Sequence, residues 1–371
     1  MTKLTIEESL LLLACRPSLE EKEQKHLASL AKNVSDWPLV LWRAENYRIM
    51  PLLHDWLSKT SSLGAAPSYV GNYMESWSAL SLSRSKAQFQ QLGRIVRSLE
   101  DESIDYFLLK GSGLAALYYP DPSLRPMQDL DFIVRPEDAS RVQQILFQLG
   151  YRHGIWDSDS ETFTPTEVRL TPYSLQSGIE IPPFTYLVRM QSPVAEKLVL
   201  PEWRRQHLKC AVKDQQLVMP VFLDVHINLS EGIDLPDVWR GARTASVFGV
   251  PTRVQSATMM LWFIATRLYY EAFAYNTLKL SMFGDVHTLL TQAQKEIDWP
   301  ELLALAHKYG TRPALYYVLA QMRTLTGVEV PLNVLSVLMP RASEIPLEND
   351  WGDVIPKLLS RPALHEFTYA T

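Results

Sequence analysis

Two aspartates one residue apart carry the clearest chemical signal in the sequence. Asp129 and Asp131 open the stretch DLDFIV, whose apolar residues predict a strand over residues 129–134. Side chains at positions i and i+2 of a strand point to the same face, so the two carboxylates should lie close together. Such a pair repels unless a cation neutralises it, and Mg²⁺ prefers oxygen ligands. The pair therefore predicts a site for one or two Mg²⁺ ions, with Mn²⁺ as the alternative.

A second predicted strand, at residues 219–229, carries a further carboxylate. One face of this strand is apolar and the other is mostly polar: the first has Val221, Leu223, Val225, Ile227 and Leu229, and the second has Phe222, Asp224, His226 and Asn228. Asp224 is therefore the best candidate for a third carboxylate that completes a two-metal site, although a turn at the strand end could also satisfy it. His226 shares its face and either lines the site or makes a structural hydrogen bond.

A glycine-serine turn precedes the aspartate pair. The buried strand predicted at residues 104–109 ends at Gly111, where glycine would let the backbone turn sharply. The short helix that follows presents free N–H groups and a positive dipole end, which suit a phosphate. The Ser112 hydroxyl would donate to that phosphate or cap the helix. The GxxxxGK[ST] spacing of a Walker A loop is absent.

Two basic residues lie close to these motifs in the chain. Lys110 and Arg125 would balance phosphate charge, or would form ordinary salt bridges. Arg267, Lys279 and Asp285 lie on predicted helices further along, where they would close over a nucleotide or form buried ion pairs.

Taken together, these motifs resemble the nucleotidyltransferase superfamily with a DNA-polymerase-β-like fold, and more narrowly the bacterial uncharacterised nucleotidyltransferase group. The motifs that carry the resemblance are Lys110-Gly111-Ser112, Tyr119-Pro120-Asp121-Pro122, Arg125-Pro126-Met127 and Asp129-Leu130-Asp131. The resemblance continues in Asp224-Val225-His226 and covers most of the chain.

This resemblance implies transfer of a nucleoside monophosphate from a nucleoside triphosphate to an acceptor, with release of pyrophosphate. It implies that Gly111 and Ser112 hold the triphosphate and that Asp129 and Asp131 bind both metals. Asp224 would help to bind the second metal and would act as base toward the acceptor hydroxyl. ATP is the default donor because it is abundant.

The pattern of elements predicts an α+β fold in three parts. Residues 1–100 and 236–371 are expected to be helical, and residues 101–235 are expected to form a polymerase-β-like nucleotidyltransferase core, a mixed sheet with helices. The stretch at about 151–215 looks like a β-rich insertion, with strands predicted at 167–170 and 178–188. This insertion could build an acceptor site, and the basic cluster at 203–209 is either a solvated face or a contact for an anionic acceptor. The nucleotide would lie between the sheet and the C-terminal helices.

Composition excludes several classes of protein. The 371 residues carry a net charge of −5, so the chain is not a polycation that binds nucleic acid in bulk. The two cysteines, Cys15 and Cys210, form no CxxC pair, which argues against a disulfide framework or a cysteine-rich zinc site. The apolar stretch 257–275 contains Arg267 and Glu271, so it predicts a buried helix and not a membrane span. We expect a cytoplasmic protein.

The sequence leaves the acceptor open: a small molecule, glycan, peptide, protein or RNA end all fit. Two other functions also remain open. One is a non-catalytic module that binds nucleotides for regulation or binds a partner. The other is a toxin-like nucleotidyltransferase that modifies transfer RNA or protein.

Overall fold

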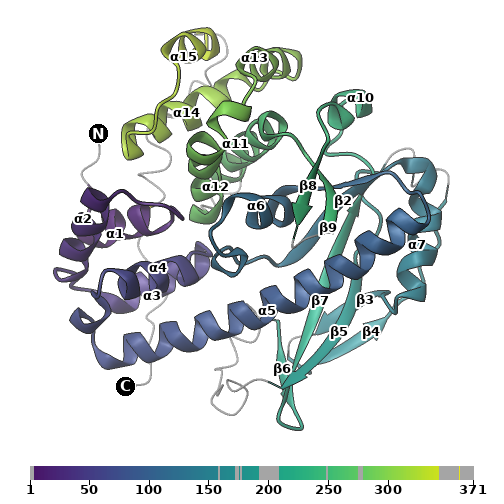
Figure 1. The fold of residues 1–371 in the computed structure, drawn as a ribbon, viewed down its shortest axis with the longest axis horizontal. Helices are drawn as coiled ribbons and strands as arrows, with labels where there is room; N and C mark the ends of the chain where they lie inside the picture. The colour runs from purple at the N-terminus through teal and green to yellow at the C-terminus, as the bar shows by residue number, and fades with distance from the viewer. Residues whose placement is uncertain are drawn as a thin grey trace. The chain divides into compact units, whose positions relative to one another are not determined.

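The computed structural model describes residues 4–157, 159–171, 175, 178–191, 209–247, 250–274, 279–341 and 359 (Figure 1). The chain divides into two compact units. The helical unit comprises Met1–Ser78, Tyr118–Arg125 and Ser256–Thr371, and the sheet unit comprises Ala79–Leu117 and Pro126–Gln255.

The helical unit begins with four short helices: α1 (Ile6–Ala14), α2 (Glu21–Ala31), α3 (Trp37–Asn46) and α4 (Met50–Lys59). Their starts follow from local sequence. Thr5 and Glu8 form a capping box at α1, and the Asp36 side chain accepts a hydrogen bond from the backbone N–H of Leu39 at α3. After η1 (Leu63–Ala65), the long helix α5 (Ser68–Asp101) contributes residues to both units.

The rest of the helical unit is built from later parts of the chain. These parts are η2 (Pro122–Leu124), α11 (Ala257–Ala274), α12 (Leu280–Gln292), η4 (Gln294–Glu296), α13 (Trp299–Lys308), α14 (Arg312–Thr326) and α15 (Leu332–Leu338). The predicted helix start at Asp298 is confirmed, because its side chain accepts from the backbone N–H of Glu301. In the described parts of the chain, no helix has the length and apolarity needed to cross a membrane.

The sheet unit contains nine described strands in one mixed sheet. They are β1 (Tyr106–Leu108), β2 (Asp129–Val134), β3 (Arg152–Asp157), β4 (Thr162–Pro165), β5 (Phe184–Gln191), β6 (Ala211–Lys213), β7 (Gln216–His226), β8 (Arg243–Val247) and β9 (Val250–Val254). Their order is β4-β3-β5-β7-β2-β1-β9-β8, and β6 pairs with β7. The β2–β7 and β1–β9 pairs are parallel, and the other pairs are antiparallel. The predicted α+β fold with a mixed sheet is confirmed.

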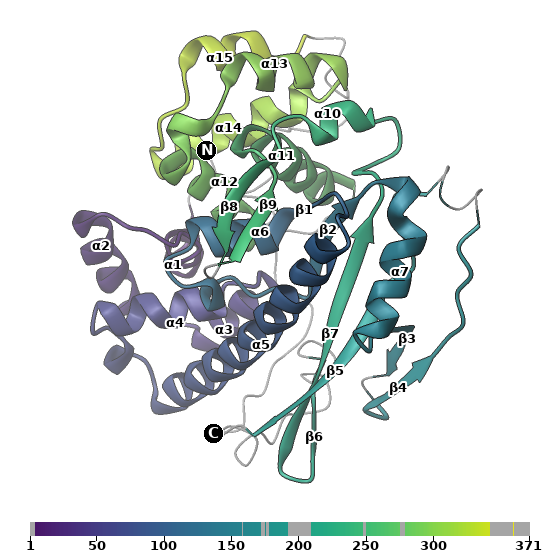
Figure 2. The ribbon, with the colours of Figure 1, turned by 45° about the vertical axis from the view of Figure 1, so that its right-hand side comes forward.

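The central strands are the most deeply buried part of this sheet. Every residue of β1 is buried, and in β2 only Asp129 is partly exposed. Figure 2 shows the long strands β5 and β7 side by side, with β6 returning along β7. The helices of this unit are the end of α5, α6 (Lys110–Tyr118, of which all but Tyr118 belongs here), α7 (Ala139–Gln148) and α10 (Leu235–Trp239), with η3 (Pro136–Asp138).

The structure corrects three expectations for secondary structure. Strands β8 and β9 lie within the stretch predicted to be helical, because β9 adds in parallel to β1 at Leu108 and Val254, and this pairing leaves no local signal. No strand covers residues 167–170; the strand lies earlier, at β4, where it pairs with β3. The strand predicted at 178–188 begins at Phe184 and continues to Gln191.

Candidate active site

Strands β2 and β7 bring three carboxylates together. The strands are parallel neighbours, and their register places Asp131 opposite Asp224. Asp129 lies two residues before Asp131, on the same face of β2. One oxygen of each of the three carboxylates lies within 4.8 Å of the others. The third carboxylate considered in the sequence therefore stands on the strand adjacent to the first two.

Two side chains hold the middle carboxylate, Asp131. Its Oδ1 atom lies 2.6 Å from Nζ of Lys110 and 2.9 Å from Nε2 of His226. Burial alone would raise the pKa of Asp131, but the Lys110 ammonium and the bond to His226 hold it well below its usual range. Asp131 is therefore ionised at any physiological pH.

The Lys110 backbone makes the turn between β1 and α6. Its φ is 46°, in the left-handed region that non-glycine residues rarely adopt, whereas Gly111 has no positive φ. The expectation that Gly111 makes this turn was therefore wrong. Such a conformation costs about 1 kcal/mol or more, and the ion pair with Asp131 offsets part of that cost.

Asp224 has the opposite electrostatic setting from Asp131. Burial and the negative charges of Asp129 and Asp131 raise the pKa of Asp224 to about 7, although Lys110 opposes the shift. Lys110 pairs with Asp131, and its opposing effect on the pKa of Asp224 is smaller than the effects of burial and of the two neighbouring carboxylates.

The arrangement fits a divalent cation. All three residues offer hard oxygen donors, and their spacing is compatible with one ion or with two ions about 3.5–4 Å apart. A divalent ion would offset the mutual repulsion of the three carboxylates. The acidic triad, defined as Asp129, Asp131 and Asp224, could therefore bind a metal.

The predicted phosphate-binding turn lies at the start of α6. Ser112 is buried, and its hydroxyl lies 2.9 Å from the carbonyl oxygen of Leu109 and 3.1 Å from that of Asp131. The hydroxyl hydrogen is therefore engaged by the main chain and ties α6 to the end of β1 and to β2. What the turn offers to an anion is the first-turn N–H groups of Gly111 and Ser112, which have no partner within a helix.

Arg125 belongs to the helical unit, and there it pairs with Asp285. Its Nε and Nη2 atoms lie 2.7 and 2.6 Å from the two carboxylate oxygens, and the Tyr119 hydroxyl donates to Oδ1 at 2.8 Å. Only 12% of the Arg125 side chain and 1% of the Asp285 side chain are exposed. Arg125 and Asp285 thus form a buried ion pair with each other. The sequence had offered such a pair as the alternative to a role at the nucleotide. Arg267 and Lys279 likewise both pair with Glu271.

The sequence model of a family described as uncharacterised nucleotidyltransferase matches residues 33–327, more than half of the chain. The chain belongs to this family. No curated protein matches it.

Membership confirms the predicted family and the predicted enzyme class. The matched range contains the acidic triad, the β1–α6 turn and all nine described strands. The chain is a nucleotidyltransferase, and its family implies a nucleoside triphosphate as substrate.

A cavity of about 320 Å³ opens beside the acidic triad of this nucleotidyltransferase. Two triad members, Asp129 and Asp224, line it, together with Gln128, Gly154, Ile155, Trp156, Pro183, Thr185, Lys209 and Phe222. Lys209 is the one described member of the basic cluster at 203–209, whose other residues lie outside the described chain. Phe222 could have been found from the sequence because it shares the polar face of β7 with Asp224. Trp156 left no such signal, because its place depends on the pairing of β3 with β5.

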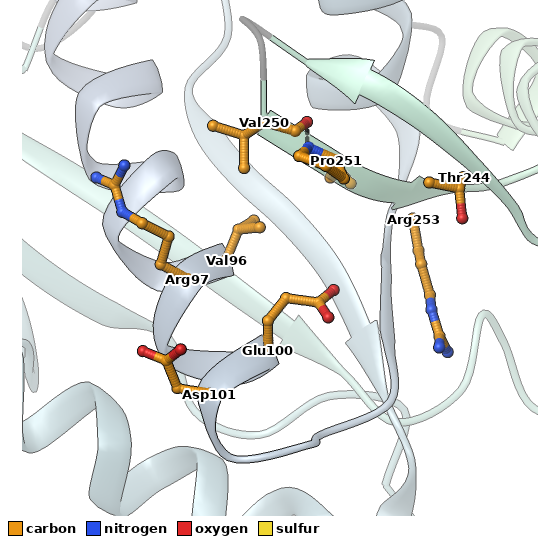
Figure 3. A pocket seen from close by; sticks show the side chains of 9 residues that line it. Val96, Arg97, Glu100, Asp101, Thr244, Val250, Pro251 and Arg253 are labelled. Carbon is orange, nitrogen blue, oxygen red and sulfur yellow. Dashed lines mark hydrogen bonds between the residues drawn. The ribbon is translucent and has the colours of Figure 1, made fainter.

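A second cavity of the nucleotidyltransferase, of about 390 Å³, lies between the last turns of α5 and the β8–β9 hairpin (Figure 3). Its walls carry both charge signs, with Arg97 and Arg253 against Glu100 and Asp101. None of the residues predicted for the site lines it. Two arginines and two carboxylates line this cavity, so its lining has no excess of either charge.

Proposed function

We propose that this nucleotidyltransferase transfers a nucleoside monophosphate from a nucleoside triphosphate, ATP by default, to an acceptor hydroxyl with the aid of Mg²⁺. The observation that carries the proposal is the acidic triad. Three carboxylates on adjacent strands lie within 4.8 Å of one another, and the pKa of one of them is raised to about 7. Such an arrangement is costly to a fold unless a cation compensates it.

The carboxylates divide the work according to their surroundings. Asp129 and Asp131 would hold the metal, and Lys110 and His226 fix the position of the Asp131 carboxylate. Asp224 would also bind metal and would accept the proton of the acceptor hydroxyl. The bound metal would neutralise the phosphates and polarise the α-phosphoryl group.

The reaction that follows from these roles is an in-line displacement. The acceptor oxygen forms a bond to the α-phosphorus, the bond from that phosphorus to the bridging oxygen breaks, and pyrophosphate leaves. The N–H groups of Gly111 and Ser112 at the start of α6 would hold the triphosphate. The proposal assigns no nucleotide contact to Arg125, since Asp285 already engages its guanidinium.

Labelling of cell extract tests the proposal. The protein is incubated with each α-labelled nucleoside triphosphate, Mg²⁺ and extract, alongside D129N and D131N. D138N is the matched control, since Asp138 lies in the sheet unit outside the acidic triad and its carboxylate pairs with Arg141. We expect a labelled product with wild type and D138N and none with the other two variants. A product that D129N and D131N form equally well would contradict the proposal. Nucleotide binding without any transfer would favour the non-catalytic module.

A further inference from the structure

The cavity beside the acidic triad reaches the carboxylate to which the proposed function assigns the acceptor proton. Asp224 and Asp129 form part of its wall, while Asp131 faces Lys110 and His226. A molecule that fills this cavity therefore has its reactive group beside Asp224. The volume of about 320 Å³ is at the small end of ligand pockets and suits one small molecule or one side chain.

Most of the cavity wall comes from the stretch at about 151–215, not from the central strands. That stretch supplies six of the ten lining residues, namely Gly154, Ile155, Trp156, Pro183, Thr185 and Lys209. The two strands of the β3–β4 hairpin approach closely at Gly154: a Cβ atom added there would lie 2.4 Å from the carbonyl oxygen of Thr164. This close packing fixes the wall of the cavity before any ligand binds.

The wall offers a flat apolar surface. Trp156 and Phe222 line it, and the register of β3, β5 and β7 places their rings on the same face of the sheet. Two aromatic rings on one wall suit a ligand with an apolar ring of its own.

One end of the wall offers positive charge and a free donor. The Lys209 ammonium lies 4.7 Å from the centroid of the Phe222 ring. The indole N–H of Trp156 is buried and has no hydrogen-bond partner among the described residues. A buried donor without a partner costs free energy that a ligand acceptor atom would recover.

The register of β7 sets the distance between the two ends. Phe222, which carries Lys209 over its ring, and Asp224 are two residues apart on the same strand, or about 7 Å. We infer that the cavity is the acceptor subsite, and that it takes an acceptor whose apolar ring separates a hydroxyl at Asp224 from an anionic group at Lys209. This inference rests on the proposed function, and a hydroxyphenyl group that bears a carboxylate has suitable length and chemistry.

Ligand-observed NMR on the full chain without nucleotide tests the inference. The probe is 3-(4-hydroxyphenyl)propionate, and its matched neutral probe is the corresponding propanamide. We expect wild type to bind the acid about tenfold more tightly than the amide, because a carboxylate forms a stronger, charge-assisted hydrogen bond with the Lys209 ammonium than a neutral amide does. K209Q should remove this preference, K209R should keep most of it, and W156F should weaken both probes by about fivefold or less.

K308Q is the control, because Lys308 makes the same kind of contact with a ring, that of Tyr309, in the helical unit. It should bind both probes as wild type does. Equal binding of acid and amide by wild type, binding of neither, or an unchanged preference in K209Q would each overturn the inference.

The two proposals fail in different experiments. If extract labelling depends on Asp129 but neither probe binds, the inference falls and the proposed function stands. If the acid binds through Lys209 but no nucleotide is transferred, the proposed function falls, and the cavity keeps its ligand class but not its role as acceptor subsite.

Discussion

Two carboxylate sites of the described chain, one in each unit, lie in different electrostatic surroundings. Asp285 in the helical unit meets one guanidinium through two hydrogen bonds and one hydroxyl, from Arg125 and Tyr119. In the acidic triad of the sheet unit, three carboxylates lie within 4.8 Å of one another, and the pKa of Asp224 is raised to about 7. The first site pairs one carboxylate with one guanidinium, whereas the second gathers three like charges. Crowding of like charges, and not burial or residue type, thus separates a structural carboxylate from a candidate catalytic one.

The largest expected effect is on transfer when the triad loses a charge. D131N should lower the rate of product formation by about 10³-fold or more, because an amide cannot replace a carboxylate that positions metal and substrate charge. The rate at which labelled product forms from α-labelled nucleoside triphosphate in cell extract measures this effect. The folded fraction of D285N should transfer at the wild-type rate. A D131N rate within tenfold of wild type would contradict the assignment.

The next largest effect is expected on stability, when the Asp285 carboxylate loses its cation. R125M leaves the Asp285 carboxylate buried without its guanidinium and should lower the free energy of unfolding by about 3–5 kcal/mol. Urea denaturation measures it. R253M is the control, because Arg253 pairs with Asp105 where both side chains are 47% exposed, and its loss should cost about 1 kcal/mol or less. Equal costs for the two variants would mean that the Arg125 pair is not structural.

The pH dependence of stability should also report the crowded triad. The pKa of Asp224 is about 7 in the folded protein and about 4 in an unfolded chain, so the folded state binds the proton more tightly. In the absence of divalent ions, this group makes the free energy of unfolding fall as pH rises from about 4 to about 7, with no further change above that. Urea titrations at several pH values in EDTA measure the slope. D224N should lack this contribution, and an unchanged slope would show that Asp224 titrates normally.

The smallest effect is expected at the wall of the cavity. G154A places a Cβ 2.4 Å from the Thr164 carbonyl oxygen and 2.6 Å from the Phe163 ring, so the hairpin must shift. We expect a loss of about 1–3 kcal/mol in the free energy of unfolding and weaker binding of the acidic probe. G64A is the control, since a Cβ at Gly64 meets nothing within 4 Å. Wild-type stability in G154A would argue against a preformed wall.

The parts of the site that were predictable are those with a local signal. The Asp-Leu-Asp strand, the alternation around Asp224 and the start of α13 at Asp298 are all written in neighbouring residues. The register between two strands leaves no signal in neighbouring residues. The sequence therefore suggested that Asp224 belongs to the site but did not give its position opposite Asp131. The pairing of Arg125 with Asp285, 160 residues apart, was likewise beyond any local pattern.

The missed strands β8 and β9 have the same explanation. Their residues alternate weakly, and they are held by pairing with each other and with β1. The turn before α6 is a different case: a glycine stood at the expected place, but Lys110 took the left-handed conformation. Its ammonium pairs with Asp131. This is a tertiary contact, and the turn propensities of neighbouring residues do not predict it.

The central claim is that the acidic triad holds a divalent cation because three carboxylates crowd one site on two adjacent strands. Titration of Mn²⁺ followed by electron paramagnetic resonance, with wild type, D129N, D224N and D138N, tests this most directly. We predict that wild type and D138N bind Mn²⁺ and that Mg²⁺ competes for it, while D129N and D224N bind it at least tenfold more weakly, about 1.4 kcal/mol. Equal Mn²⁺ binding by all four proteins, or none by wild type, would contradict the claim.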